Sequence, residues 1–331
     1  MTQDTPHSRI LTVGTGAIGA YYTWRMQQSG HCTVTAVCRS NYEAVKSKGI
    51  EIQTVAWGEG PHVFKPDDVV RTVPSKTYDY IIVCMKALPE VYSIADIIAP
   101  AVEASPNAAI VLIQNGIGIE DPIKARFPRN PILSSIAYIG VTQNELGVVY
   151  HSGKVQRLVV GLYEPIEGVD TASTLQTFGD FCKEGGIETI VSDDIQNYRW
   201  QKLVWNGAMN PICILSDLWT VSNVLANEKY REMAFRTKTE IASLAEALGY
   251  KMPPGLVDMS MATSERLADG YKASMVVDLE EGRPMETEVI LSNPIRIAEE
   301  HNLTHIIPTW YQLYKDLVKY LADRQANKQK M

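Results

Sequence analysis

An apolar segment followed at once by a glycine pattern is the feature that most restricts what this chain can fold into. Residues 10–13 are Ile-Leu-Thr-Val, and they lead into Gly14-Thr15-Gly16-Ala17-Ile18-Gly19. A strand, G-x-G-x-x-G and a helix in succession are typical of a dinucleotide-binding turn. Gly14 would permit the tight turn, Gly16 would let backbone approach a pyrophosphate, and Gly19 would let the helix pack on the strand. We predict that all six residues of the pattern contact a dinucleotide.

The residue that closes the second predicted strand indicates which dinucleotide. Residues 33–38 form an apolar run that ends on Arg39, and no acidic residue occurs between Asp4 and Glu43. A carboxylate at this point would bind the ribose 2'-hydroxyl of NAD, whereas a guanidinium suits the 2'-phosphate of NADP. The pattern therefore favours NADP. The alternatives are that Arg39 is an ordinary solvated arginine and that the glycine pattern belongs to an FAD-binding domain.

Composition excludes several classes of protein. The chain has 331 residues, enough for two domains, and a net charge of −7 with both signs mixed along its length. This pattern argues against binding to nucleic acid or a membrane surface, and neither a membrane span nor a signal peptide is predicted. The five cysteines are scattered without a C-x-x-C pair, as in a reduced cytoplasmic protein. His301 and His305 lack further ligands, so no metal site is expected.

The two halves of the chain differ in pattern. Short apolar runs alternate with helical segments as far as residue 192, which predicts a Rossmann-type NADP-binding domain over residues 1–192. Residues 193–331 read as an all-helical substrate domain, with Asp193 or Asp194 as the cap of its first helix. Further strands are predicted at 80–85, 109–113 and 132–136, and an edge hairpin at 148–151 and 158–161 around Ser152-Gly153-Lys154. Helices are predicted at 194–215, 226–249, 257–271, 284–302 and 308–323.

Polar residues follow two of the predicted strands. Lys86 ends one strand, and Gln114-Asn115-Gly116 ends the next. Ligands of open α/β sheets bind at the carboxyl ends of strands, so Lys86 and Asn115 are candidate cofactor-binding residues. The alternatives are a lysine that reaches solvent and a simple Asn-Gly turn.

The first helix of the second half carries a polar stripe in apolar surroundings. Lys202, Asn206 and Asn210 recur at four-residue steps, so they fall within about 80° of one another around the helix. Large apolar residues flank them, and a buried polar group without a partner costs roughly 1–3 kcal/mol. Either a structural hydrogen-bond network or an oxygen-rich substrate must satisfy them. In the second case Lys202 can donate a proton to the alkoxide formed when hydride attacks a ketone.

Several segments together resemble the 2-dehydropantoate 2-reductase (ketopantoate reductase) family. Besides the glycine pattern, Lys86 and Gln114-Asn115-Gly116, two longer motifs agree. Residues 202–211 resemble its K-L-x-x-N-x-x-x-N-P helix, and residues 274–286 resemble its S-M-x-x-D-x-x-x-G-R-x-x-E segment. The resemblance covers nearly the whole chain and implies a helical C-terminal domain of the 6-phosphogluconate dehydrogenase type.

Carried over residue by residue, the resemblance implies a set of roles. Lys202 is the general acid, and Glu286 lies near the reacting centre and the nicotinamide ribose, close enough to keep the lysine charged. Asn115, Asn206, Asn210 and Ser274 contact the substrate. From the residues alone, Ser274 is equally a helix cap, and Glu286 is a first-turn helix acid after Pro284.

The resemblance implies NADPH-dependent reduction of 2-dehydropantoate to (R)-pantoate, for pantothenate and coenzyme A synthesis. The partner is then a small 2-ketoacid, and the protein is a monomer or homodimer. Alternatives are a related reductase of another 2-ketoacid, a non-catalytic NADP-binding redox sensor, and a flavoprotein. The sequence departs from the family pattern at three places that we expect to affect the substrate rather than the cofactor. Thr220 stands where an asparagine is common, Asp217 stands where a loop glycine is common, and Thr287-Glu288 stands where Ile-Asp is usual.

Overall fold

The protein, seen in a computed structural model, is described over residues 7–58, 60–217, 219–267 and 269–328. It forms two compact units. Unit 1 comprises the chain up to Ala87 with Tyr92–Gln114 and Ile119–Ile195, and unit 2 comprises Leu88–Val91, Asn115–Gly118 and the chain from Gln196 onwards. The change from unit 1 to unit 2 lies three residues from the predicted boundary at 192/193. Two short segments of the N-terminal half nevertheless belong to unit 2.

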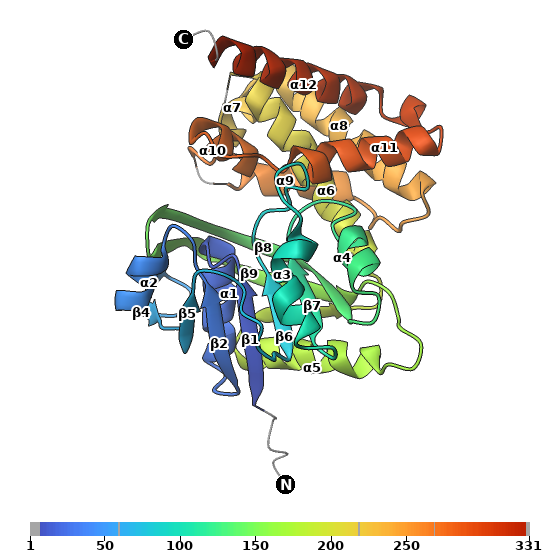
Figure 1. Ribbon diagram of the computed structural model, residues 1–331. Coiled ribbons are helices and arrows are strands. Elements are labelled where there is room, and N and C mark those ends of the chain that lie inside the picture. Colours follow the sequence, from blue (N-terminus) through green and yellow to red (C-terminus); the bar gives the residue numbers. More distant parts are fainter. Residues whose placement is uncertain (1–6, 59, 218, 268, 329–331) are drawn as a thin grey trace. The chain divides into compact units, whose positions relative to one another are not determined.

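Unit 1 is built on one mixed sheet (Figure 1). In the described residues its strand order is β4-β3-β9-β8-β7-β6-β1-β2-β5, with β10 also beside β9. The strands are β1 Ser8–Val13, β2 Cys32–Val37, β3 Ile50–Thr54, β4 Pro61–Phe64, β5 Asp68–Val70, β6 Tyr80–Val83, β7 Ala109–Ile113, β8 Ile132–Glu145, β9 Val148–Leu162 and β10 Glu188–Ser192. The predictions did not include β3, β4 or β5.

Neighbouring strands from β8 through β7, β6, β1 and β2 to β5 run parallel. Strands β6 and β7 are buried along their whole length, which explains why they read as continuous apolar runs rather than as alternating ones. The helices of unit 1 are α1 Ala17–Gln27, α2 Tyr42–Lys48, α3 Ile94–Glu103, α4 Asp121–Arg126 and α5 Thr171–Glu184. Helices α1 and α5 pack against each other and against β9.

The predicted hairpin around Ser152-Gly153-Lys154 is wrong. Residues 148–162 form the single long strand β9, and the hairpin turn is Leu146-Gly147, between β8 and β9. Gly153 does have a φ of +89°, so the local signal for a turn was real. However, β9 pairs with β8, β3 and β10, and these ladders keep it extended inside the sheet rather than at its edge.

Unit 2 is helical in its described residues (Figure 1). Its elements are α6 Ile195–Leu215, α7 Val221–Ala226, α8 Glu228–Ala247, α9 Leu256–Glu265, α10 Ser274–Glu280, the π-helical turn η1 Glu288–Ser292, α11 Asn293–Glu300, the 3-10 turn η2 Thr304–Ile306 and α12 Pro308–Lys328. The short helices α7 and α10 were not predicted, and the helix predicted over 284–302 starts later and contains the π turn. Within the described ranges, no helix has both the length and the apolar character needed to cross a membrane.

Helix α6 is held at its middle by an indole from α12. Pro211 lacks the N–H that would bond the carbonyl of Gly207 four residues earlier. That carbonyl accepts instead from Trp310 Nε1 at 2.8 Å. A Cβ at Gly207 would lie 3.0 Å from both the Trp310 ring and Ile241, so the glycine permits the close approach. This packing anchors the helix that carries Lys202 in the core of unit 2.

Candidate active site

The glycine turn of unit 1 has the geometry that its spacing predicts. Gly14 has a φ of +93°, and a Cβ there would lie 2.4 Å from the backbone nitrogen of Met85. A Cβ at Gly19 would lie 2.3 Å from the Gly14 carbonyl oxygen, so only glycine lets α1 sit this close to β1. Thr15 is buried, and its hydroxyl donates to the Val37 carbonyl at 3.0 Å. The Thr15 N–H also donates to the Val37 carbonyl, at 3.3 Å, and the Thr15 carbonyl accepts from Asn41 Nδ2 at 2.8 Å, so Thr15 holds the turn against the end of β2.

The space above Gly16 is open, and one amide stands at its rim. The nearest heavy atom to a Cβ at Gly16 would be Gln143 Oε1, at 3.9 Å. Gln143 Nε2 is buried and has no hydrogen-bond partner among the described residues. It lies in a stretch of β8 where the register with β9 shifts, and such irregularities redirect side chains. The amide oxygen of Gln143 thus borders the open space, and rotation of the amide would let its unpartnered Nε2 donate to a phosphate oxygen bound beside Gly16.

Tyr92 connects two predicted cofactor residues. The Arg39 guanidinium is exposed at the end of β2 and lies 5.6 Å from the centre of the Tyr92 ring. The Tyr92 hydroxyl donates to the backbone carbonyl of Lys86 at 2.6 Å. The Tyr92 ring thus lies beside the Arg39 guanidinium, and its hydroxyl holds the backbone at Lys86. Sequence reasoning missed Tyr92, because an isolated tyrosine in a loop has no periodic signal.

The three residues of the polar stripe on α6 differ in how far they are exposed and in what they contact. Lys202 is partly exposed, Asn206 is 7% exposed and Asn210 is fully buried. Asn210 Oδ1 accepts from the Met275 backbone N–H at 3.0 Å, and its Nδ2 donates to the Asn206 carbonyl at 2.9 Å. Asn210 thus takes part in a structural hydrogen-bond network, which is one of the two alternatives considered for the polar stripe. Any influence of Asn210 on a substrate would pass through the start of α10, which it holds.

Ser274 is the first residue of α10 and is exposed. The cap position belongs to Ala273, so Ser274 is not the helix cap. Because Asn210 binds the N–H of the next residue, Met275, the position of the Ser274 hydroxyl depends on α6. The two longest predicted motifs, 202–211 and 274–286, therefore meet at this bond.

Glu286 lies beside Asn115 in unit 2. The Asn115 side-chain amide donates to Glu286 Oε2 at 3.2 Å, and Glu286 is only 5% exposed. Its backbone carbonyl accepts from Ile290 N–H at 3.1 Å, which places Glu286 immediately before the helix that starts at Thr287. The interpretation of Glu286 as a first-turn acid is therefore wrong by one position. The carboxylate faces the segment that contains Asn115.

The π turn η1 explains how Asn115 is held there. The Asn293 N–H bonds the Glu288 carbonyl five residues earlier, so the corresponding donor for the Val289 carbonyl would be Pro294, which has no N–H. The free carbonyl of Val289 accepts from Ile117 N–H at 2.8 Å instead. Asn293 Nδ2 completes the pair by donating to the Ile117 carbonyl at 2.8 Å. Two backbone groups of Ile117 are thus tied to one short helical segment.

Gly116 makes this close docking possible. Its φ is +100°, and a Cβ there would lie 2.4 Å from the Val289 Cβ. Its carbonyl accepts from Arg199 Nη1 at 3.0 Å. Arg199 is 2% exposed and precedes Lys202 by three residues on α6. Residues three apart lie on the same side of a helix, so this spacing could have identified Arg199, but the sequence analysis did not include it among the site residues.

Lys202 is surrounded by groups that set its charge. Burial lowers the pKa of its ammonium to about 8, the Glu286 carboxylate opposes this shift, and the Arg199 guanidinium adds to it. Glu286 thus acts on the charge of Lys202 in the direction expected of a nearby carboxylate. An amine with a pKa near 8 is mostly protonated at neutral pH and can still give up its proton, which is the requirement for a general acid.

The departures from the family pattern have local explanations. Asp217 has a φ of +65°, a left-handed conformation that glycine adopts freely and aspartate tolerates. Thr220 caps α7, with its hydroxyl accepting from Asn223 N–H at 3.2 Å. Thr287 opens the helix after Glu286, and the Glu288 carboxylate pairs with Arg296. The first two departures therefore serve the backbone of unit 2.

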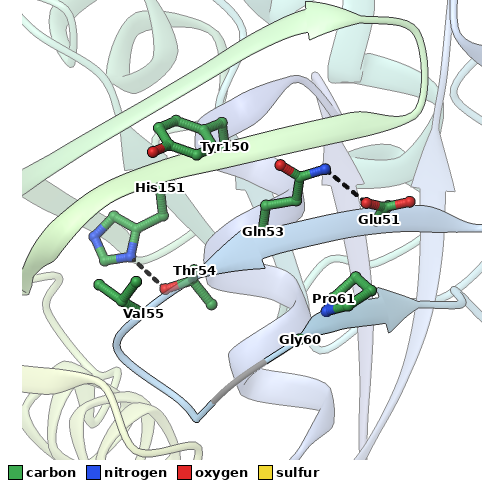
Figure 2. A pocket seen from close by; sticks show the side chains of 8 residues that line it. All are labelled: Glu51, Gln53, Thr54, Val55, Gly60, Pro61, Tyr150 and His151. Carbon is green, nitrogen blue, oxygen red and sulfur yellow. Dashed lines mark hydrogen bonds between the residues drawn. The ribbon is translucent and has the colours of Figure 1, made fainter.

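Other parts of the chain do not add to this site. A cavity of about 320 Å³ lies over β3, β4 and β9 of unit 1, and none of the predicted site residues lines it (Figure 2). Its His151 has both ring nitrogens engaged, with the Thr54 hydroxyl at 2.8 Å and the Val155 carbonyl at 2.9 Å. The described residues contain no cluster that could hold a metal ion. All five cysteines are free, and burial raises the pKa of each thiol.

Comparison with known proteins agrees with this geometry. Residues 10–165 match the family model "Ketopantoate reductase PanE/ApbA", and residues 194–319 match its C-terminal counterpart. The chain belongs to the ketopantoate reductase family. A crystal structure of 2-dehydropantoate 2-reductase from Methylococcus capsulatus is 35% identical, with a TM-score of 0.82 over 96% of this chain and 97% of that one. The predicted family and fold class, a Rossmann-type domain followed by a helical domain, are thereby confirmed.

Two fungal relatives within the ketopantoate reductase family are each 30% identical. A Saccharomyces cerevisiae protein of uncharacterised function matches over 97% of this chain and 96% of its own length. The meiotically up-regulated gene 72 protein of Schizosaccharomyces pombe matches over 90% of this chain, which spans only 54% of that longer protein. The family resemblance thus extends over both units, but these two relatives do not identify a substrate.

Proposed function

We propose that this protein reduces 2-dehydropantoate to (R)-pantoate with NADPH, a step toward pantothenate and coenzyme A. In balance, NADPH and one proton convert the C2 ketone to an alcohol and leave NADP⁺. Cofactor and substrate are inferred from the site residues, and the family supports an NAD(P)-dependent reductase.

The residues of unit 1 fit the phosphates of the cofactor. The glycine turn would bind the pyrophosphate through backbone N–H groups, with Gln143 Nε2 as a further donor. Arg39 would bind the 2'-phosphate, and Lys86 would contact phosphate or ribose from the next strand end. When bound, the reduced nicotinamide supplies the hydride that adds to C2 of the substrate.

Unit 2 would supply the proton and the substrate contacts. Lys202 would donate its proton to the oxygen that becomes the alkoxide, and Glu286 keeps the ammonium protonated until then. Asn115, Asn206 and the exposed Ser274 hydroxyl offer hydrogen bonds to the carboxylate and hydroxyl of the substrate, and Asn210 acts by holding the start of α10. The observation that carries the proposal is the hydrogen bond of 3.2 Å from the Asn115 amide to the buried Glu286 carboxylate, which also raises the pKa of Lys202 against the effect of burial.

The main alternative is a reductase of another 2-ketoacid. One solved structure of the same fold, 19% identical, is a D-mandelate dehydrogenase with NADH and anilino(oxo)acetate. That protein differs in both cofactor and substrate from the reaction proposed here. The departure at Thr287-Glu288 also directly follows Glu286, a residue expected near the reacting centre. A non-catalytic NADP sensor is less favoured because it has no need of a tuned proton donor.

The test is NADPH oxidation by the purified protein with a panel of 2-ketoacids. We expect ketopantoate to have the highest kcat/KM, above 2-ketoisovalerate and phenylglyoxylate, and Lys202→Ala to lower kcat by at least about 100-fold, as loss of a general acid does. Preference for another ketoacid would identify the related reductase. Tight NADPH binding without turnover of any ketoacid would identify the sensor, and a yellow protein would identify a flavoprotein.

A further inference from the structure

Arg199 is a charged side chain in the interior of unit 2 to which the proposed reaction gives no role. It is 2% exposed and lies one helical turn before Lys202 on α6. Burying a guanidinium is unfavourable unless its N–H groups find acceptors. Its contacts therefore indicate what this arginine is for.

The guanidinium holds a segment that is distant in sequence. Nη1 donates to the Gly116 carbonyl at 3.0 Å, in the segment Asn115–Gly118 that belongs to unit 2. The same segment is bound by the Val289 carbonyl and by Asn293 Nδ2 through Ile117. Asn115–Gly118 is therefore attached at once to α6, which carries Lys202, and to the residues that follow Glu286.

We propose that Arg199 is a positioning residue that ties the Gly116 carbonyl to α6 and thereby sets where Asn115 stands relative to Lys202 and Glu286. The inference rests on the proposed function, since it assigns Arg199 a part in presenting Asn115 to a 2-ketoacid. Arg199 acts through Gly116 and does not itself contact the substrate.

The charge of Arg199 has a second consequence at the same place. Among the described residues, Glu286, from the stretch before η1, and Arg199, from α6 itself, both act on the charge of the Lys202 ammonium. Burial is the largest cause of the lowered pKa of Lys202, Glu286 raises that pKa, and Arg199 lowers it. One side chain thus both holds Asn115 and influences the proton donor, and the two effects can be separated by substitution.

The separation uses Arg199→Met and Arg199→Lys, with Arg236→Met as the control. Arg236 is an exposed arginine of α8 that pairs with Glu232. In Arg199→Met we expect the KM for the ketoacid to rise about tenfold or more, because a charge-assisted hydrogen bond is lost. The alkaline limb of the pH–rate profile should move to higher pH. In Arg199→Lys the limb should stay near its original pH while KM remains raised, because an ammonium replaces the charge but not the geometry of the guanidinium.

A double-mutant cycle with Asn115→Ala decides whether the effect passes through Asn115. If it does, Arg199→Met raises KM much less in the Asn115→Ala background than in the wild type. Fully additive effects on KM, or an Arg199→Met enzyme with an unchanged KM, would overturn the proposal. If Arg199→Met does not fold, Arg199→Lys takes its place in the cycle, and an unchanged KM in that variant is equally decisive.

The result is distinguishable from failure of the proposed function. If the wild type turns over no ketoacid, the proposed function is wrong, but the Lys202 amine can still be titrated by NMR on lysine-labelled protein. Its signal is assigned with Lys202→Arg. Arg199→Met, or Arg199→Gln if the methionine variant is unfolded, must then raise the titration midpoint of Lys202. A midpoint that does not move would overturn the influence of Arg199 on Lys202, and an Asn115 side-chain amide resonance that is unchanged in the variant would overturn the positioning role, both without reference to turnover.

Discussion

The side-chain amide of Asn115 donates a hydrogen bond of 3.2 Å to the carboxylate of Glu286, across 171 positions of the sequence. Asn115 follows strand β7 and Glu286 precedes the helical segment that contains η1, yet both belong to unit 2. Their contact brings a candidate substrate-binding amide next to the carboxylate that helps to keep Lys202 protonated.

Glu286→Gln should make the enzyme lose activity at a lower pH. Glu286 raises the pKa of Lys202, so its neutralisation lets burial and Arg199 depress that pKa further below about 8. Since the general acid must be protonated, the alkaline limb of kcat/KM should move to lower pH. Measured pH–rate profiles check this, with Glu288→Gln, whose carboxylate pairs with Arg296, as the control. A limb at its original pH would show that Glu286 does not act on the charge of Lys202.

Gly116→Ala should damage both stability and substrate binding. The residue has a φ of +100°, and its new Cβ would meet Val289 at 2.4 Å, so the Asn115–Gly118 segment would have to leave its place. Gly282→Ala is the control, because Gly282 has a φ of +68° with open space around it. The control should lose roughly 1–2 kcal/mol of unfolding free energy from backbone strain alone. Urea denaturation should show a larger loss for Gly116→Ala, together with a raised ketoacid KM, and equal losses with an unchanged KM would contradict the assignment.

Arg39→Ala should reduce the preference for NADPH over NADH. The exposed guanidinium at the end of β2 is the group proposed to meet the 2'-phosphate, and only NADPH carries that phosphate. The ratio of the two kcat/KM values should fall about tenfold or more, mainly through the KM for NADPH. Arg71→Ala is the control, because Arg71 is also an exposed arginine of unit 1 and pairs with Glu43. An unchanged ratio would mean that Arg39 is a solvated arginine that does not bind the 2'-phosphate.

Lys238→Met should stabilise the protein most at and below pH 7. Lys238 is fully buried in α8, where its ammonium donates to the Ser260 carbonyl and the Ser264 hydroxyl at 3.0 Å each. Burial lowers its pKa from 10.5 to about 7, with Glu265 opposing the shift. Between these values the unfolded chain binds a proton that the folded protein has lost, so the unfolding free energy of the wild type rises with pH.

The advantage of Lys238→Met should therefore shrink between about pH 7 and pH 10.5, by an amount on the order of a few kcal/mol. Chemical denaturation of both proteins at pH 6.5 and pH 9.5 measures the difference directly. An advantage that is the same at both pH values would mean that Lys238 titrates as it does in the unfolded chain.

Local patterns were reliable where neighbouring residues decide the structure. The glycine turn, the buried strand 109–113 and the helix that begins near residue 195 were all predicted because apolar periodicity and glycine spacing act over a few residues. The strand 148–162 was misjudged because the turn signal at Gly153 is local, whereas the three strands that pair with β9 are not. Helices α7 and α10 were missed because they are too short to establish a period.

The sequence by itself determined the kinds of chemistry available: glycines for a phosphate turn, a cation at the end of the second strand, and a lysine with two amides on one helix face. These follow from spacing, because the periods of strands and helices are properties of the local backbone. Only the tertiary structure decided that Asn115 meets Glu286, that Asn210 holds the start of α10, and that Arg199 binds Gly116. The Gly116 carbonyl that Arg199 binds and the Val289 carbonyl that Ile117 binds are backbone groups, which every residue possesses, so no residue type in the sequence can reveal these contacts.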